Sequence, residues 1–180
     1  LNIVEFVTNY VAKRKAAESR HALDESSLPK NREIEQALRE HQRLFHGGDQ
    51  PTQLRALREA ACEAMRHLAR FEPRLVGAVL DGTADTHSTV CLHLFCDTPE
   101  SVLAMLNDDD MVFEEDSRRL RLDAERSADF PVLRMNQSGI DFDLTVLPRD
   151  AIRQAPLDRS GERPLQRAAL AAVENLLSAS

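Results

Sequence analysis

The sequence predicts an α+β fold in which a mixed sheet is covered by helices. The first observation is that apolar residues recur at helical spacing through residues 1–70. The second is a change to alternating polar and apolar residues in 88–96 and again in 140–146. The third is the order of the elements, which runs as helices, two strands, a helix, several strands and a last helix. This order is typical of α+β proteins, whereas α/β proteins alternate strand and helix regularly.

The N-terminal part predicts three helices, over 1–19, over 31–45 and from Pro51 to about residue 70. Asn31 is a favourable N-cap for the second helix, and a proline in the first turn suits the third. Pro73 ends this part. One face of the third helix is apolar, with Leu54, Leu57, Ala61, Met65 and Leu68. We therefore predict a helical N-terminal extension over residues 1–70.

Residues 71–150 predict the sheet-containing core. A short apolar run, Leu75–Leu80, stops at Asp81-Gly82-Thr83, and a strand follows over Ser88–Cys96. A short helix is expected over Ser101–Asn107. The remaining strands are expected over 112–115, 118–122, 130–135 and 140–146. Residues 151–180 then predict a linker and a C-terminal helix opened by Pro164.

Composition excludes several classes of protein. The chain has 180 residues and a net charge of −7, which argues against a general DNA-coating or membrane-coating role. With 4% aromatic residues, a stacking platform for single-stranded nucleic acid is not expected. No apolar run approaches the roughly 20 residues that span a bilayer, and Leu1–Ala12 has the wrong charge order for a signal peptide. Three cysteines suit a reducing compartment, so we expect a cytoplasmic protein without a membrane partner.

Alternation places the candidate chemistry on particular strand faces. Thr89, Cys91 and His93 share one face of the strand at 88–96, opposite Val90, Leu92, Leu94 and Cys96. Asp141 and Asp143 share one face of the strand at 140–146. These aspartates are interpreted as ligands of one metal ion, as groups that orient a ribose, or as solvated carboxylates of a half-exposed strand.

The histidine and the cysteines leave further alternatives open. His93 fits a general base or a phosphate contact, and equally a structural histidine bonded to a neighbouring strand. Cys91 fits a nucleophile served by His93, although a buried structural cysteine is the simpler interpretation. A zinc site of Cys91, His93, Cys96 and His87 is disfavoured, because Cys96 lies on the other strand face. The basic cluster Lys13-Arg14-Lys15, with Arg20, suits nucleic acid or an acidic partner, although a solvated helix face is the simpler interpretation.

Gly82-Thr83, the Ser88–Leu92 strand and Asp143 together resemble the nucleotidyltransferase superfold, over about residues 71–148. In that family a Gly-Ser turn approaches the nucleotide phosphates, a Ser-Asp-hydrophobic-Asp strand supplies two carboxylates, and a later strand supplies a third. Together they hold two Mg²⁺ for in-line attack on a phosphate. The resemblance implies a nucleotidyltransferase-like sheet. It places Gly82, Thr83 and Ser88 at the phosphates, Asp143 or Asp141 at Mg²⁺, and His93 as the base in the groove.

The sequence departs from this pattern at both carboxylates of the first strand, where Thr89 and Cys91 stand. One carboxylate about 4 Å from a dication contributes roughly 8 kcal/mol at an effective dielectric constant of 20, before desolvation. The usual two-metal mechanism is therefore not expected, and whether the chain is an enzyme stays open. We expect a binder of a nucleoside triphosphate, with or without Mg²⁺, or a pseudoenzyme. The alternative is a non-catalytic protein–protein interaction module.

A second resemblance rests on Tyr10–Ala17 and on the Leu-His-Leu-Phe strand, Leu92–Phe95. The chain is similar to small proteobacterial proteins labelled nucleotidyltransferase or UDP-N-acetylmuramate–alanine ligase. The ligase label is physically implausible for these residues. Such ligases hold ATP phosphates with a glycine-rich loop that ends in Gly-Lys-Ser/Thr, and Lys13, Lys15 and Lys30 stand in no such loop.

Overall fold

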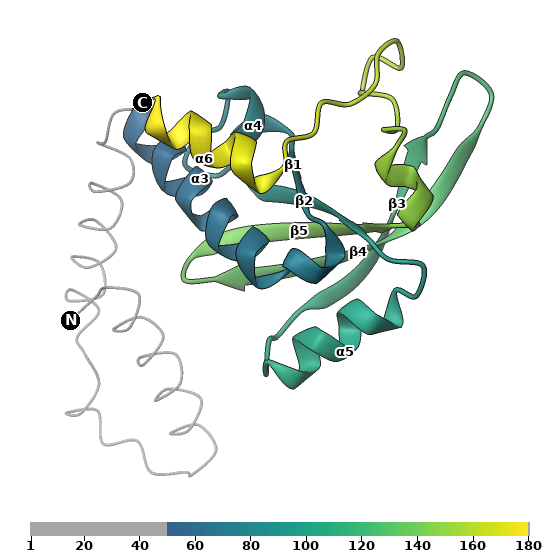
Figure 1. Ribbon diagram of the computed structural model, residues 1–180, viewed down its shortest axis with the longest axis horizontal. Helices are drawn as coiled ribbons and strands as arrows, with labels where there is room; N and C mark the ends of the chain where they lie inside the picture. The colour runs from purple at the N-terminus through teal and green to yellow at the C-terminus, as the bar shows by residue number, and fades with distance from the viewer. Residues whose placement is uncertain (1–49, 180) are drawn as a thin grey trace, which may run out of the picture. The chain divides into compact units, whose positions relative to one another are not determined.

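The computed structural model describes residues 50–179, and the predicted helices over 1–19 and 31–45 lie outside this range. The described residues form an α+β unit built on a five-stranded mixed sheet, as the sequence predicts (Figure 1). The strands are β1 (Arg74–Val76), β2 (Val90–Phe95), β3 (Glu114–Arg121), β4 (Ser127–Gln137) and β5 (Ile140–Leu147). Their order in the sheet is β1-β2-β5-β4-β3.

Strand pairing brings together segments that are far apart in the sequence. β2 and β5 are parallel neighbours in the middle of the sheet, and the other pairs are antiparallel. In this register Cys91 pairs with Asp143 and His93 with Thr145. On the other side of β5, Arg134 of β4 pairs with Asp143. The sheet therefore places the predicted groove residues of β2 beside the aspartate of β5.

One face of the sheet is covered by helices, three of which overlap predicted helices. They are α3 (Gln50–His67), α4 (Ala78–Asp81), α5 (Glu100–Asp108) and α6 (Leu170–Ser178). Leu57, Ala61 and Met65 of α3 are buried against Leu92, Leu94 and Leu144 of the central strands. Burying one such side chain contributes about 1.5–3 kcal/mol. Helix α3 shares this core and belongs to a compact unit that begins at Gln50. The predicted N-terminal helical part, residues 1–70, includes this helix.

Several element boundaries differ from the prediction. β1 stops at Val76, because Gly77 takes a positive φ of 78° and Ala78–Asp81 form the short helix α4. The two strands expected at 112–115 and 118–122 are one strand, β3. The last helix begins at Leu170 rather than at Pro164. The preceding residues are extended, and Ala168 exchanges two backbone hydrogen bonds with Leu75 of β1.

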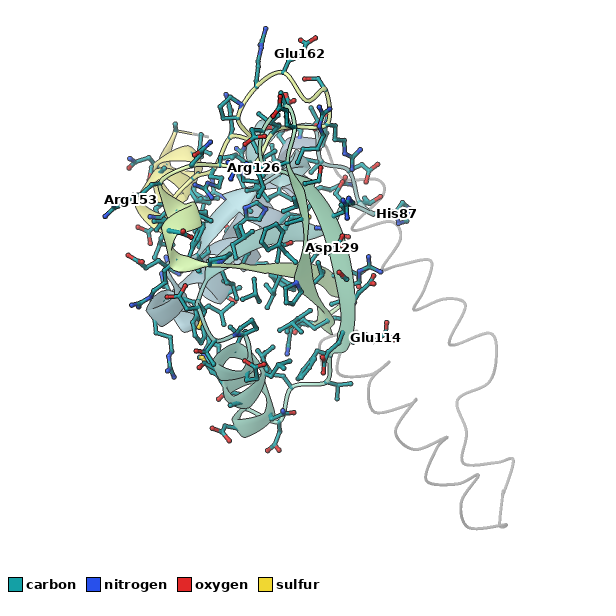
Figure 2. All side chains as sticks on the ribbon, turned by 90° about the vertical axis from the view of Figure 1, so that its right-hand side faces the viewer. His87, Glu114, Arg126, Asp129, Arg153 and Glu162 are labelled. Atoms are coloured by element: carbon teal, nitrogen blue, oxygen red, sulfur yellow. The ribbon has the colours of Figure 1, made fainter. Side chains whose placement is uncertain are left out.

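The segment between β5 and α6 contacts the other face of the sheet. It includes a short 3₁₀ helix, η3 (Arg149–Ile152). Another 3₁₀ helix, η2 (Ala69–Phe71), lies elsewhere in the chain, after α3. The guanidinium of Arg167 donates hydrogen bonds to the carbonyls of Ala151 and Ile152 and lies 5.0 Å from the ring centroid of Phe95 on β2. The loop that carries Glu162 and the β3–β4 turn at Arg126 lie at the same end of the molecule (Figure 2). In the part of the chain described here, every helix is too short or too polar to cross a membrane.

Candidate functional site

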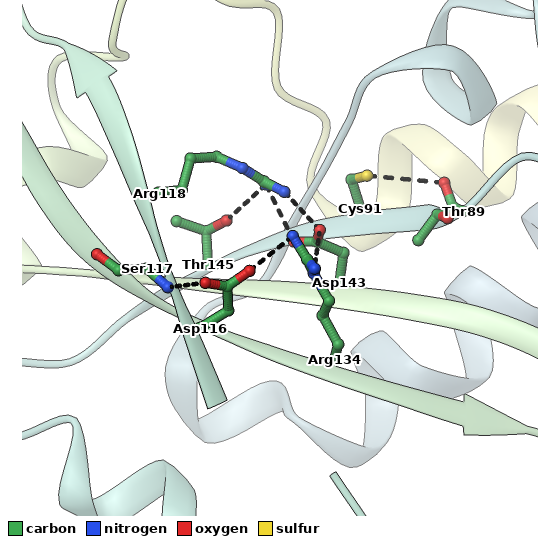
Figure 3. A network of polar contacts seen from close by, with 8 residues as sticks. All are labelled: Thr89, Cys91, Asp116, Ser117, Arg118, Arg134, Asp143 and Thr145. Carbon is green, nitrogen blue, oxygen red and sulfur yellow. Dashed lines mark hydrogen bonds and ion pairs between the residues drawn. The ribbon is translucent and has the colours of Figure 1, made fainter. Parts of the chain in front are cut away.

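The candidate site is a polar cluster on the sheet face opposite the helices, centred on Asp143. Alternation along the strands puts Cys91, Arg134 and Asp143 on this face, side by side on β2, β4 and β5. Arg118 reaches Asp143 from β3, across β4 (Figure 3). Asp143 itself is 6% exposed. A buried carboxylate needs a compensating charge and hydrogen bonds, and the neighbouring arginines supply both.

The guanidinium of Arg118 binds both oxygens of Asp143. Nη2 donates to Oδ2 at 2.6 Å and Nη1 donates to Oδ1 at 3.0 Å. Nη1 also donates to the hydroxyl of Thr145 at 3.3 Å. This bidentate pairing raises the pKa of Arg118, chiefly through its hydrogen bonds to Asp143. The carboxylate of Asp143 is therefore held in one orientation by a permanent cation.

Arg134 adds a second positive charge beside the same carboxylate. Its Nε lies 3.9 Å from Oδ2 of Asp143, and its Nη2 lies 2.9 Å from a carboxylate oxygen of Asp116. The four side chains form an alternating network of two arginines and two aspartates (Figure 3). Arg134 is half-exposed, so it contacts both this network and solvent.

Cys91 and Thr89 occupy the β2 side of the site. The thiol of Cys91 donates a weak hydrogen bond to the Thr89 carbonyl, with 3.7 Å between Sγ and the oxygen. Burial, and then the negative charge of Asp143, raise the pKa of Cys91 to about 11. At neutral pH the group is a protonated thiol, which is a poor nucleophile and a poor metal ligand.

Gly77 is a residue of this site that the sequence interpretation missed. It lies directly after β1, and a Cβ built on it would be 4.0 Å from the Cβ of Cys91. Its φ of 78° and ψ of −156° are accessible mainly to glycine. The signal for this turn in the sequence is a glycine immediately after the apolar pair Leu75-Val76. The glycine turn beside Cys91 is therefore Gly77-Ala78, five residues before the predicted Gly82-Thr83.

A cavity of about 590 Å³ opens beside Asp143. Its polar side is lined by Thr89, Glu114, Arg134, Asn136, Asp141 and Asp143. Its apolar side comes from Val112, Phe113, Met135 and Phe142. Its volume lies in the range of small-molecule binding pockets, about 300–1,000 Å³. The two predicted aspartates of β5 therefore share one cavity, with Asp141 at its exposed end.

Gly82, Thr83 and Ser88 do not line this cavity. Gly82 ends α4 and faces α3, where Arg58 donates hydrogen bonds to the carbonyls of Val79 and Leu80. The Thr83 amide donates to the Ala78 carbonyl. The hydroxyl of Ser88 donates to the carboxylate of Asp85 at 3.0 Å. In this structure these three residues form local turns.

His93 is also separate from the cavity. It is 3% exposed, between Arg74 of β1 and Thr145 of β5. Burial, together with the charges of Arg167 and Arg118, lowers the pKa of His93 to about 4. Its Nδ1 is buried with no hydrogen-bond partner in the described residues. The imidazole is therefore neutral at physiological pH, and His93 is not among the residues that line the cavity.

The residues of this site do not suit a divalent cation. Both oxygens of Asp143 accept hydrogen bonds from Arg118, and Oδ1 of Asp141 accepts one from the Asn136 amide at 2.7 Å. Beside them stand Cys91 of β2 and Thr89, which directly precedes that strand. Within residues 50–179, no three His, Cys, Asp or Glu side chains come together in a way that could hold a metal ion. Mg²⁺ needs octahedral oxygen coordination, which this cluster does not offer.

Comparison of the chain with protein-family models, with curated proteins and with solved structures finds no match.

Proposed function

We propose that this chain is a nucleotidyltransferase-like protein that binds a nucleotide beside Asp143 and has lost two-metal transfer chemistry. The observation that carries the proposal is the bidentate bond between Arg118 and Asp143, at 2.6 and 3.0 Å, next to a cavity of about 590 Å³. A group-transfer site of the two-metal type needs free carboxylates. Here the buried carboxylate is neutralised by a side chain of the same sheet.

The walls of the cavity suit the parts of a nucleotide. The apolar side offers surface to a base, including Val112, whose side chain is 87% exposed at the cavity. The polar side offers the Asn136 amide and the Asp141 carboxylate to ribose hydroxyls and base amino groups. Arg134 offers a guanidinium to a phosphate. Placed polar groups beside apolar surface are typical of small-ligand sites.

A thermal-shift screen tests the proposal. The full chain is heated with nucleosides, nucleoside monophosphates and nucleoside triphosphates, each with Mg²⁺ or with EDTA. A ligand at 100 times its Kd stabilises the fold by about 2.7 kcal/mol, which shifts Tm by several degrees. We expect a shift that Asn136→Ala abolishes. The matched control is Asp129→Asn, because Asp129 lies on the same strand but pairs with Arg119 on the opposite sheet face.

A lack of stabilisation by every compound in the screen would contradict nucleotide binding. A shift that persists in Asn136→Ala would place the ligand elsewhere in the chain.

A second candidate function is a non-catalytic interaction module, favoured by an apolar cavity of about 290 Å³ on the helical face. Its walls include Ala60 and Ala64 of α3, Leu68 directly after that helix, Leu106 of α5 and Ile140 of β5. Self-association of the chain would support this candidate. We would measure it by sedimentation velocity over a range of concentrations, with Ala64→Glu as the disrupting variant. A monomer at all concentrations together with a nucleotide-dependent shift would exclude it.

A further inference from the structure

We infer that the cavity beside Asp143 binds its ligand without a divalent metal ion and accepts a nucleoside that carries at most one phosphate. This inference rests on the proposed nucleotide binding and names its substrate class. It follows from two features of the site: the position of Arg118 on Asp143, and the balance of charges around the cavity.

The first feature is that a guanidinium already occupies the carboxylate that a metal ion would need. Arg118 bonds both oxygens of Asp143, and Nε of Arg134 lies 3.9 Å from one of them. A divalent cation would have to displace Arg118 and then sit beside two positive charges. Mg²⁺ also dehydrates reluctantly and prefers several oxygen ligands, which this cluster lacks.

The rest of the site does not replace the missing ligands. Cys91 stands opposite Asp143 in the strand register, but its thiol is protonated at neutral pH and its hydrogen bond goes to the Thr89 carbonyl. Asp141 is exposed, and its Oδ1 accepts a hydrogen bond from the Asn136 amide. A ligand in this cavity is therefore recognised by protein groups alone.

The second feature is that the cavity offers a single half-exposed guanidinium, that of Arg134, to the several negative charges of a polyphosphate. Its charged lining consists of Glu114, Asp141 and Asp143 against Arg134. Arg118 neutralises Asp143, and Arg134 is already paired with Asp116 at 2.9 Å. A triphosphate without a metal ion would bring several negative charges close to Glu114 and Asp141. Like charges that are close together repel strongly when they are partly shielded from water.

A nucleoside suits the same groups. Its ribose hydroxyls and base amino groups are hydrogen-bond donors, and the carboxylates of Glu114 and Asp141 are acceptors. One phosphate can be met by the half-exposed guanidinium of Arg134. Donor groups of the ligand matched to carboxylate acceptors give charge-assisted hydrogen bonds, which are stronger than neutral ones.

Isothermal titration calorimetry of the full chain tests the inference. The probes are adenosine, AMP and ATP, followed by the corresponding guanosine, cytidine and uridine series, each in EDTA and in excess MgCl₂. We expect the Kd of the nucleoside or monophosphate to differ by less than about twofold between the two buffers. We expect the triphosphate to bind at least about tenfold more weakly, a difference of about 1.4 kcal/mol.

A charge variant sharpens the test. Glu114→Gln removes one carboxylate from the cavity lining and should improve triphosphate binding several-fold. Asp129→Asn removes one carboxylate from the opposite face of the same two-stranded edge and should leave it unchanged. Both carboxylates are exposed, so neither change should disturb folding (Figure 2).

The outcomes separate this inference from the proposed function. Tight triphosphate binding that needs Mg²⁺ and disappears in EDTA would overturn the inference and leave nucleotide binding standing. Equal affinity for the nucleoside and the triphosphate in EDTA would overturn the charge argument. Absence of binding by all the probes would overturn the proposed function itself.

Discussion

Cys91 and Asp143 stand opposite each other on the parallel strands β2 and β5, and Arg118 neutralises the aspartate of this pair. The pair lies on the sheet face that the helices leave uncovered, beside the cavity lined by Asp141 and Asp143. Because parallel strands are about 4.8 Å apart, a carboxylate at position 91 would have met Asp143 directly. The protein instead combines a neutral thiol, one carboxylate and one guanidinium, an arrangement that favours binding over metal-dependent transfer.

Removing Arg118 should destabilise the fold strongly. In Arg118→Leu the carboxylate of Asp143, whose side chain is 8% exposed, would lose its bidentate partner. We expect a loss of about 3 kcal/mol in the free energy of unfolding, at the lower end for buried pairs because Arg118 is itself partly exposed. Urea denaturation followed by circular dichroism measures the loss.

The ion pair of Arg119 and Asp129 provides the control for Arg118→Leu. It starts from the same strand, β3, but joins it to β4, and both of its side chains are more than half exposed. Arg119→Leu should cost about 1 kcal/mol or less. The double variant Arg118→Leu, Asp143→Leu should be more stable than Arg118→Leu alone. Equal losses for Arg118→Leu and Arg119→Leu would show that Asp143 needs no internal cation.

Cys91 should react slowly with alkylating reagents at neutral pH. Its pKa is raised to about 11, first by burial and then by the charge of Asp143. At pH 7.5 its labelling by iodoacetamide should be about a hundredfold slower than that of an unhindered cysteine. Asp143→Asn should speed labelling, because it removes the negative charge and leaves Arg118. Peptide mass spectrometry over a range of pH follows the reaction.

Cys96 is the internal reference for this experiment, since it follows the opposite end of β2 and is partly exposed. Labelling of Cys91 at the rate of Cys96 at pH 7.5 would contradict the raised pKa.

The sequence predicted the class of fold better than the site, and the reason is register. Alternation in 88–96 and 140–146 was sufficient to assign strands and to place Asp141 and Asp143 on one face. Nothing local shows that β5 pairs with β2 across some 50 intervening residues, or that Arg118 reaches across β4. The alternation of Asp116, Arg118 and Leu120 on one face of β3 was a visible signal. Its partner was not, because that partner belongs to another strand.

The misplacement of the glycine turn has a separate physical cause. The apolar run Leu75–Leu80 fits a short buried strand or a short helix equally well by its pattern. Its two halves adopt different structures because Gly77 takes a positive φ between them. The strand therefore ends at Val76, four residues before the end of the apolar run.

Gly77→Ala should be more costly than Gly82→Ala. Gly77 has φ 78° and ψ −156°, a region open mainly to glycine, whereas Gly82 has φ 83° and ψ 10°, in the left-handed helical region. We expect a loss of about 2–3 kcal/mol for the first and about 1–2 kcal/mol for the second. A Cβ at position 77 would meet the Cβ of Cys91 at 4.0 Å, an ordinary contact, so the cost arises from the backbone. Chemical denaturation measures the free energy of unfolding of both variants, and equal losses of stability would contradict this account.

His93 should make the protein less stable as the pH falls from 7 to 5. Its pKa is about 4 in the folded chain, below the value near 6.5 of an exposed histidine, because of burial and the charges of Arg167 and Arg118. Between about pH 4 and pH 6.5, the imidazole of His93 therefore binds a proton in the unfolded chain but not in the folded chain. The part of the folding stability that depends on this pKa difference is present above about pH 6.5 and is lost progressively down to about pH 4.

The variant His93→Leu isolates this effect. Between pH 7 and pH 5 the wild type should lose about 2 kcal/mol more than His93→Leu. His67→Gln is the control, since His67 is half exposed and pairs with Asp109. Urea titrations at several pH values provide the comparison. Parallel pH profiles for wild type and His93→Leu would show that the imidazole does not resist protonation.

A metal site should appear when the guanidinium is removed and a carboxylate is restored. The double variant Arg118→Ala, Cys91→Asp would free both oxygens of Asp143 and place a second carboxylate opposite it in the register. We expect this variant to bind Mn²⁺, seen as loss of the free-ion signal in electron paramagnetic resonance, and the wild type to leave the signal unchanged. Cys91→Asp alone should not bind, because Arg118 still occupies Asp143. Circular dichroism confirms that each variant is folded. Stoichiometric Mn²⁺ binding by the wild type would contradict the role assigned to Arg118, since a cation would then share Asp143 with two arginines.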